Sequence, residues 1–201
     1  MIEKIFFENV SLSFGSHKIF KNLTLEFTAG KIFGISGRNG AGKSTLLKLA
    51  GKILKPDSGE VNFSSDLKIA AVTPEMQIYN DLTAAENLKF FSRLRNKNLS
   101  AEKIFELFQR VGLDFKNFGN VRVENFSTGM KQRLKFAILL SVDAEIFLLD
   151  EPTSNLDDEG RNIFYAEIKK LSQLEKIILL ATNDDEDLKI CDENIDLNKI
   201  K

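Results

Sequence analysis

Four short apolar runs stand out from a sequence in which polar and apolar residues are otherwise mixed. They are KIFGIS (31–36), KIAAVT (68–73), EIFLLD (145–150) and KIILLAT (176–182). Runs without regularly spaced polar positions are typical of strands that are covered on both faces. Because helical segments separate them, the pattern predicts a parallel β-sheet in a domain of the α/β class.

The beginning of the chain has a different pattern. Residues 2–14 and 21–27 alternate in part between apolar and polar positions, which favours antiparallel strands. Residues 55–63, KPDSGEVNF, add a tight reversal and another strand, because Pro, Asp, Ser and Gly each favour turns. We therefore expect an antiparallel β subdomain in addition to the parallel sheet.

The middle of the chain has the periodicity of helices. Thr83 and Glu86 have capping-box spacing ahead of apolar positions that share one helix face. Ser100 is a suitable cap for a second helix, which closes at Gly112.

These patterns predict one domain over residues 1–201, a length that allows a compact core with a subdomain. We expect a helical subdomain over about residues 76–134, inserted into a core formed by about residues 1–75 and 135–201.

Composition and charge restrict the partners. A net charge of −1 argues against a general nucleic-acid or anionic-membrane surface. No apolar run approaches the roughly 18 residues of a membrane span, and the N-terminal sequence lacks a signal-peptide cleavage pattern. The single cysteine, Cys191, excludes an internal disulfide, fits a reducing compartment and is expected to be a small buried hydrophobe. We therefore expect a cytoplasmic protein that binds no nucleic acid and reaches a membrane only through a partner.

The first chemical motif is GRNGAGKST, which fits the pattern G-x-x-x-x-G-K-[ST] of a phosphate-binding loop. Glycines allow backbone N–H groups to surround a polyphosphate, and the following helix directs its positive end at it. The apolar run before the motif and the helical pattern after it argue against a chance glycine-rich turn. The expected nucleotide-binding residues are Gly37, Arg38, Asn39, Gly40, Ala41, Gly42, Lys43, Ser44 and Thr45.

In this loop Lys43 is expected to reach the β- and γ-phosphates and Ser44 to bind Mg²⁺. Asp150 and Glu151 follow the third apolar run, where the strand ends and α/β folds bind ligands. Asp150 is a candidate Mg²⁺ ligand, and Glu151 is a candidate to orient or deprotonate the attacking water. Two adjacent acids alone would indicate a solvated turn, but the phosphate loop favours the catalytic interpretation.

A second anion-binding pattern lies in VENFSTGMKQRLKFAILL. Ser127 and Gly129 open an expected helix, and Lys131 and Arg133 follow in its first turns. A serine cap and the N–H groups of a helix start favour an anion. An ordinary helix cap would explain Ser127 but not the residues that follow it.

Together these motifs resemble the nucleotide-binding domain of ATP-binding cassette (ABC) transporters over essentially the whole chain. GRNGAGKST is similar to the family's phosphate loop, NFSTGMKQR to its signature, and FLLDEPTSNLD to its Walker B strand and D-loop. The resemblance implies an α/β fold with a P-loop NTPase (RecA-like) core, an antiparallel β subdomain and an inserted helical subdomain. It also implies ATP and Mg²⁺ as cofactors and ATP hydrolysis as the activity.

The resemblance implies partners as well. Two cassettes, as a homodimer or with a paired second cassette, pack head to tail, so that each ATP lies between one subunit's phosphate loop and the other's signature. Ser127 and Gly129 then bind a neighbour's nucleotide, Asp157 of the D-loop contacts the neighbour, and Phe14 stacks on adenine. A strand phenylalanine is otherwise usually part of a core. The dimer acts on a transmembrane permease subunit at the inner face of the cell membrane.

Three positions depart from the family pattern. The signature has Met130 in place of the usual Gln, at a position peripheral to the phosphate where little effect is expected, and STGMKQRL looks like variants of exporter-type cassettes, which favours export. Where the family's Q-loop has Gln, this chain has Glu75, which either approaches Mg²⁺ as an oxygen ligand or turns outward; Gln77 comes two residues later. Where the family has a switch His, LLATND has Asn183. Asn can donate a hydrogen bond but cannot relay a proton, so we expect a slow ATPase that depends on Glu151.

The cargo is not encoded in these motifs. A minimal cassette without an accessory domain is similar to those of haem, cytochrome-maturation or drug-type exporters, which favours export. A nonhydrolysing or soluble ATP switch remains an alternative. DNA-acting members carry a long insertion and ribosome-acting members two cassettes, and a GTPase would have an N-K-x-D motif. The acidic stretch NDDEDL (183–188) is expected to be a solvated face.

Overall fold

The computed structural model describes residues 3–200 and divides them into two compact units. The first unit comprises the chain up to Thr73, Ala144–Glu151 and the residues from Ile168 onward. The second comprises Pro74–Asp143 and Pro152–Glu167. The second unit thus takes in residues 135–143 and the D-loop region 152–167, which the sequence pattern assigned to the core; the signature region falls in it as expected.

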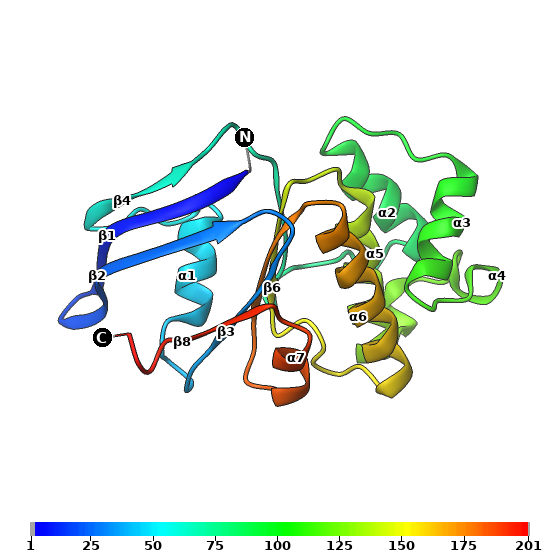
Figure 1. The fold of residues 1–201 in the computed structure, drawn as a ribbon. Helices are drawn as coiled ribbons and strands as arrows, with labels where there is room; N and C mark the ends of the chain where they lie inside the picture. The colour runs from blue at the N-terminus through cyan, green and yellow to red at the C-terminus, as the bar shows by residue number, and fades with distance from the viewer. Residues whose placement is uncertain (1–2, 201) are drawn as a thin grey trace. The chain divides into compact units, whose positions relative to one another are not determined.

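An antiparallel sheet in the order β2-β1-β4 opens the first unit, as predicted (Figure 1). Its strands are β1 (Lys4–Phe14), β2 (His17–Thr28) and β4 (Ser58–Phe63). The expected first strand began at Ile2, which lies outside the described residues. Positive φ at Gly15 (59°) allows the tight turn between β1 and β2, so that Phe14 pairs with His17.

The second sheet of this unit is parallel and has the order β5-β6-β7-β3-β8. All four apolar runs form strands in it, as β3 (Ile32–Ser36), β5 (Ile69–Val72), β6 (Ile146–Asp150) and β7 (Ile177–Ala181). Every residue of β6 and β7 is buried, which explains their uninterrupted apolar sequence. The fifth strand, β8 (Glu193–Asp196), was not predicted, because ENID is short and polar.

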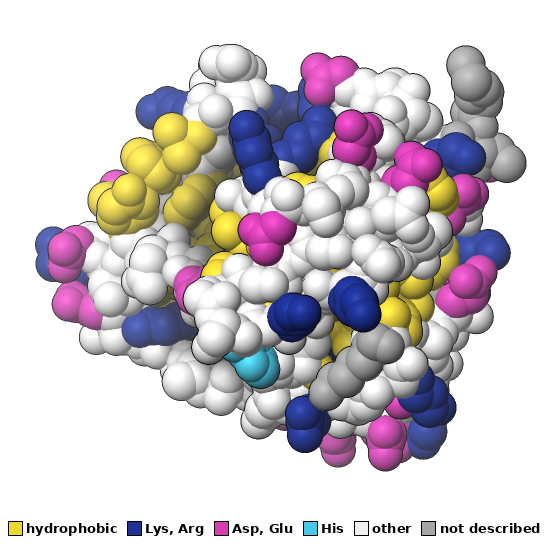
Figure 2. All heavy atoms as spheres, turned by 90° about the vertical axis from the view of Figure 1, so that its left-hand side faces the viewer, with side chains coloured by type: hydrophobic (Ala, Val, Ile, Leu, Met, Phe, Trp, Pro, Cys, Tyr) yellow, Lys and Arg dark blue, Asp and Glu magenta, His cyan; other side chains and the backbone are white. Residues whose placement is uncertain are grey.

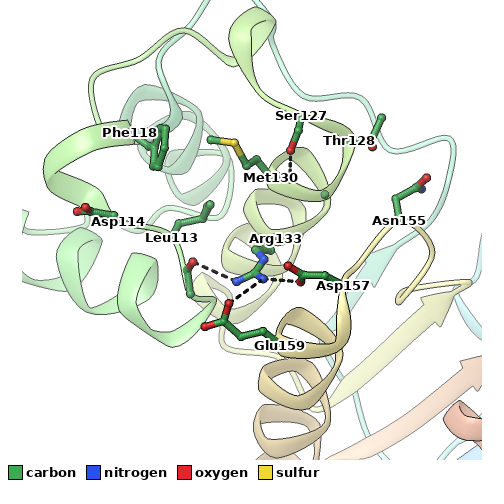
Figure 3. A pocket seen from close by; sticks show the side chains of 12 residues that line it. Leu113, Asp114, Phe118, Ser127, Thr128, Met130, Arg133, Asn155, Asp157 and Glu159 are labelled. Atoms are coloured by element: carbon green, nitrogen blue, oxygen red, sulfur yellow. Dashed lines mark hydrogen bonds and ion pairs between the residues drawn. The ribbon is translucent and has the colours of Figure 1, made fainter.

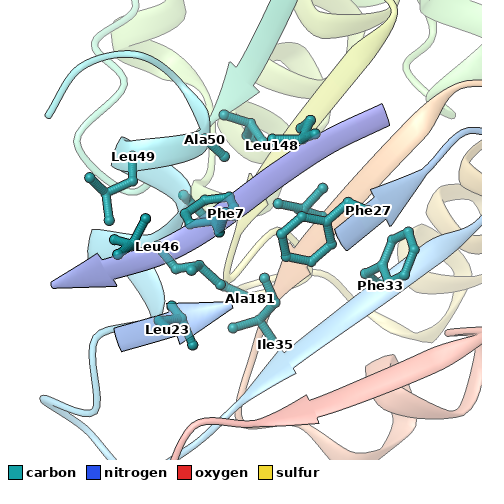
Figure 4. Close-up of a cluster of buried hydrophobic side chains, with 14 of the residues drawn as sticks. Phe7, Leu23, Phe27, Phe33, Ile35, Leu46, Leu49, Ala50, Leu148 and Ala181 are labelled. Carbon is teal, nitrogen blue, oxygen red and sulfur yellow. The ribbon is translucent and has the colours of Figure 1, made fainter. Parts of the chain in front are cut away.

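A hydrophobic core joins the two sheets of the first unit and α1 (Lys43–Ala50), the helix after the phosphate loop (Figure 4). Phe27 stands edge-on to both Phe7 and Phe33, with ring centroids 5.7 Å and 5.0 Å apart. Ala181, the last residue of β7, also belongs to this cluster. The core therefore fixes the strand ends from which the candidate site is built.

The second unit is helical. It contains α2 (Ala84–Arg93), α3 (Ala101–Arg110), the short α4 (Phe115–Phe118), a 3-10 turn (Val123–Asn125) and α5 (Thr128–Ser141). The capping box of Thr83 and Glu86 is confirmed, as is the cap at Ser100. The unpredicted helix α6 (Asp158–Gln173) starts in this unit and ends in the first.

The expectation of a solvated acidic face over 183–188 holds for Asp185 and Glu186, which are exposed, but is wrong for Asp187. Residues Asp185–Lys189 form the short helix α7, and its Asp187 has no exposed surface. Asp187 accepts a hydrogen bond from the Thr182 hydroxyl at 3.0 Å, which allows a carboxylate to be buried. Within residues 3–200 no helix is both long and apolar enough to cross a membrane.

Candidate nucleotide site

The phosphate loop connects β3 to α1 within the first unit. Gly40 and Gly42 have φ of 81° and 105°, a region that side chains rarely adopt. A Cβ on Gly42 would lie 2.7 Å from the Ile19 side chain and 2.9 Å from the ring of Phe20, whereas one on Gly40 would meet nothing within 4 Å. Gly42 thus lets the loop pack against β2, while Gly40 leaves one side of the loop open.

Lys43 is nearly buried, and two polar groups fix its ammonium. Its Nζ donates to the Gly37 carbonyl and to Oδ1 of Asn183, both at 2.9 Å. The Asn183 Nδ2 in turn donates to Asn39 Oδ1 at 2.9 Å. An ammonium has three N–H donors, so this arrangement leaves one for a phosphate oxygen. Asn183 thus contacts the loop lysine through its oxygen, whereas the sequence suggested a role for its N–H.

Asp150 and Glu151 lie at the carboxyl end of β6, as the sequence predicted for the strand end. Asp150 is buried, and Glu151 has a φ of 47°, which is strained for a residue other than glycine. The Glu151 N–H donates to the Ala181 carbonyl at 2.8 Å, which holds this conformation.

The electrostatic surroundings of Glu151 raise the pKa of its carboxyl. Burial is the largest cause, and the charges of Asp150 and Asp187 act in the same direction. The Lys43 ammonium and the Asn183 N–H oppose the shift. A carboxylate with a raised pKa is a stronger proton acceptor, which suits a general base.

Sequence reasoning missed the contribution of Thr182 to this site. Its hydroxyl lies 3.5 Å from Glu151 Oε2 and 3.0 Å from Asp187 Oδ2. The only signal was its position at the end of the apolar run KIILLAT, directly before Asn183.

The remaining expected residues of the first unit are accessible. Ser44 is exposed at the first turn of α1. Phe14 is 52% exposed, so it is not a core phenylalanine and its ring is open to stacking. His17, its strand partner, is at the surface as well (Figure 2).

The signature residues line a cavity of about 400 Å³ in the second unit (Figure 3). Ser127 caps α5 by accepting the Met130 N–H at 3.2 Å, as predicted. A Cβ on Gly129 would lie 2.9 Å from the carbonyl of Asn155, so glycine allows the D-loop to pack against the helix start. Asn155 and Asp157 of that loop line the same cavity.

Arg133 was expected to help bind an anion at this helix start, but its contacts are internal. Its guanidinium donates to the Gly112 carbonyl at 3.1 Å and to Asp157 Oδ1 at 2.7 Å (Figure 3). The Gly160 N–H, and after it Arg133, lower the pKa of Asp157. Arg133 therefore fixes the D-loop acid beside the signature.

Glu75 is exposed in the second unit, and it does not line the cavity next to it. That cavity, of about 290 Å³, is lined by Gln77 together with Thr128, Lys131 and Asn155, among others. Of Glu75 and Gln77, only Gln77 lines this cavity.

The sequence matches the ABC transporter family over residues 20–154. It is 34% identical to the ABC transporter ATP-binding protein YdbJ of Bacillus subtilis over 96% of the chain, but spans only 65% of that relative. It is 35% identical to the lantibiotic transport ATP-binding protein SrtF of Streptococcus pyogenes, over 76% of the chain and 68% of SrtF.

A solved structure is also similar to the chain. The dimeric post-hydrolysis state of the ATP-binding cassette MJ0796, bound to ADP and Pi, matches with a TM-score of 0.83 and 26% identity, over 96% of this chain and 93% of that one. The family match covers more than half of the sequence and includes the phosphate loop, the signature and the Walker B strand. The chain therefore belongs to the ABC transporter family and is an ATP-binding cassette of it.

Proposed function

We propose that this cassette hydrolyses ATP as a dimer and drives a separate membrane-spanning subunit, in the direction of export. The observation that carries the proposal is the pair of half-sites, one in each unit. Lys43 is oriented for a phosphate in the first unit, while Ser127 and Gly129 line a cavity in the second unit. In the arrangement of the family, such a signature faces the phosphate loop of a second cassette.

The residues of the first unit fit Mg·ATP. Among residues 3–200 no group of three or more His, Cys, Asp or Glu side chains is arranged to hold a metal by itself. Mg²⁺ prefers few protein ligands together with phosphate oxygens and water, so the Ser44 hydroxyl and the Asp150 carboxylate form a suitable set. An Mg²⁺ ion held there would supply positive charge that offsets the charge of the phosphates. Glu75, which is exposed and outside the described cavities, is a weaker candidate ligand.

Glu151 is the proposed general base. Its carboxylate, with a pKa raised by burial, accepts the proton of the attacking water. Lys43 binds the β- and γ-phosphates, and Asn183 keeps the lysine in position without exchanging a proton. Since Asn cannot replace the relay of a His, turnover is slow. Phe14 stacks on the adenine, and Asp157 contacts the second cassette.

The transport role rests on the family and on the relatives. SrtF is named for lantibiotic transport. If this chain also serves transport, its partner is a permease and it acts at the cytoplasmic side of the cell membrane. The two half-sites couple ATP hydrolysis to transport. ATP closes the dimer, hydrolysis opens it, and this motion moves the attached permease.

The experiment is phosphate release from Mg·ATP by the purified chain and by its Glu151→Gln variant. The wild-type chain is expected to turn over ATP, and the variant to be slower by about 10²–10⁴-fold, the range of acid–base residues. Glu8→Gln, at an exposed position of β1, is the control and should retain the wild-type rate. Unchanged hydrolysis in the Glu151 variant would remove this residue from the role of base.

A nonhydrolysing ATP switch is the second candidate, and the presence of Asn183 at the switch position favours it. This candidate predicts that the wild-type chain dimerises with ATP but releases no phosphate, both alone and with its permease.

A further inference from the structure

We infer that Thr182 is a positioning residue for ATP hydrolysis, because its hydroxyl, anchored by the buried Asp187, sets the carboxylate of Glu151. The inference rests on the proposed function, in which Glu151 is the base. It gives a role to Thr182, directly before the switch position, and to Asp187 in the helix that follows.

The end of β7 supplies a series of contacts to Glu151. The Ala181 carbonyl accepts the Glu151 N–H at 2.8 Å, the Thr182 hydroxyl lies 3.5 Å from Glu151 Oε2, and the Asn183 N–H hydrogen-bonds to the same carboxylate. Three consecutive residues thus hold a glutamate whose backbone is in the strained left-handed region. The strain persists only where neighbouring structure imposes it.

The anchoring of Thr182 is internal and rigid. Ala181 is fully buried in the hydrophobic core, and Thr182 itself has no exposed surface (Figure 4). The Thr182 hydroxyl accepts the Asp184 N–H at 3.0 Å, which directs its single proton toward the carboxylates. Neither the backbone nor the rotamer of Thr182 can change without disturbing the start of α7.

Two carboxylates compete for that one proton. Asp187 Oδ2, at 3.0 Å, is at hydrogen-bond distance, whereas Glu151 Oε2, at 3.5 Å, is at the outer limit. The proton is therefore shared: Asp187 accepts the shorter bond and fixes the hydroxyl, and Glu151 accepts a longer second bond from the same hydroxyl, which limits how far its carboxylate can turn away. This arrangement holds Glu151 while leaving its oxygens able to accept a proton from water.

The test uses Thr182→Val, which keeps the branched shape and removes the hydroxyl, and Thr182→Ser, which restores it. We expect Thr182→Val to lower kcat about tenfold, the equivalent of one hydrogen bond to a charged group, with little change in KM for ATP. Thr182→Ser is expected to recover most of the rate. Thr24→Val, which removes a hydroxyl bonded to the Asn9 N–H in the antiparallel sheet, controls for a general loss of stability.

A double-mutant cycle separates positioning from a structural effect. In the Glu151→Gln background the base is gone, so Thr182→Val should lower the residual rate much less than in the wild-type chain. A wild-type kcat in Thr182→Val, or an equal loss in both backgrounds, would overturn the inference while leaving the proposed function intact. A wild-type chain that releases no phosphate would overturn the proposed hydrolysis and this inference with it.

Discussion

Asn183 stands at the position where the family pattern has a switch His. Its amide bridges two groups of the phosphate loop, since its oxygen accepts from Lys43 and its nitrogen donates to Asn39. A histidine at this position could also donate and accept through its two ring nitrogens. Unlike asparagine, it could in addition take up and pass on a proton. The geometry thus favours a residue that orients the lysine.

Replacing Asn183 by Ala should therefore lower the catalytic efficiency with ATP. The Lys43 ammonium loses one of its two orienting hydrogen bonds, and we expect kcat/KM for ATP to fall about tenfold. Asn62→Ala, on the exposed face of β4, is the matched amide control and should leave kcat/KM unchanged. Steady-state phosphate release measures both. Equal kcat/KM values for Asn183→Ala and the wild-type chain would show that the amide does not act on Lys43.

Asp157 gives a pH-dependent prediction at the same scale. The Gly160 N–H and Arg133 hold the pKa of Asp157 below its usual value in the folded chain. Such a carboxylate stabilises the fold above its unfolded pKa, and the stabilisation is lost as the pH falls through the folded pKa. Asp157→Asn should thus have a lower Tm than the wild-type chain at pH 7, and the difference should shrink on acidification. A Tm difference that grows toward low pH would contradict this account.

Two helix N-caps can be compared directly. Ser127 and Thr83 are both N-caps whose oxygens accept a backbone N–H of the first turn. Loss of either cap is expected to lower the free energy of unfolding by about 1 kcal/mol. Only Ser127 lines the signature cavity, so only Ser127→Ala should also weaken ATP-dependent dimerisation.

Thr83→Ala is therefore a control with matched stability. Chemical denaturation measures the cap, and sedimentation with Mg·ATP measures the association. Equal association of the two variants would mean that Ser127 acts as a helix cap alone.

At the scale of elements, the sequence predicted the strands whose hydrophobic pattern has a single physical cause, burial on both faces. The buried runs became β3, β5, β6 and β7, because a strand covered on both faces has no polar position. The polar strand β8 was missed, since its position beside β3 is set by the rest of the sheet. Buried Asp187 was missed because a carboxylate is buried only when a partner such as Thr182 is placed by the tertiary fold.

The candidate site divides in the same way. Lys43, Ser44, Asp150 and Glu151 could be predicted because their motifs fix local backbone geometry at a strand end or a helix start. The hydrogen bond between Lys43 and Asn183 joins residues 140 positions apart, and no local pattern encodes it. The roles of all these residues in binding and hydrolysis remain predictions to be tested.

For the whole molecule, the central claim is that one chain holds two incomplete halves of a nucleotide site. The first unit orients a lysine for phosphate, and the second presents a capped helix start and an ordered D-loop acid. In the proposed head-to-tail dimer each half meets its complement, and the two-fold axis of that dimer produces two equivalent sites. ATP is then the ligand that favours the dimer, and its hydrolysis removes that preference.

The most direct test is the mass of the Glu151→Gln variant with Mg·ATP, measured by light scattering at high protein concentration. The account predicts twice the mass of one chain with Mg·ATP and the mass of one chain with Mg·ADP. A variant that binds Mg·ATP and yet stays monomeric throughout would contradict it.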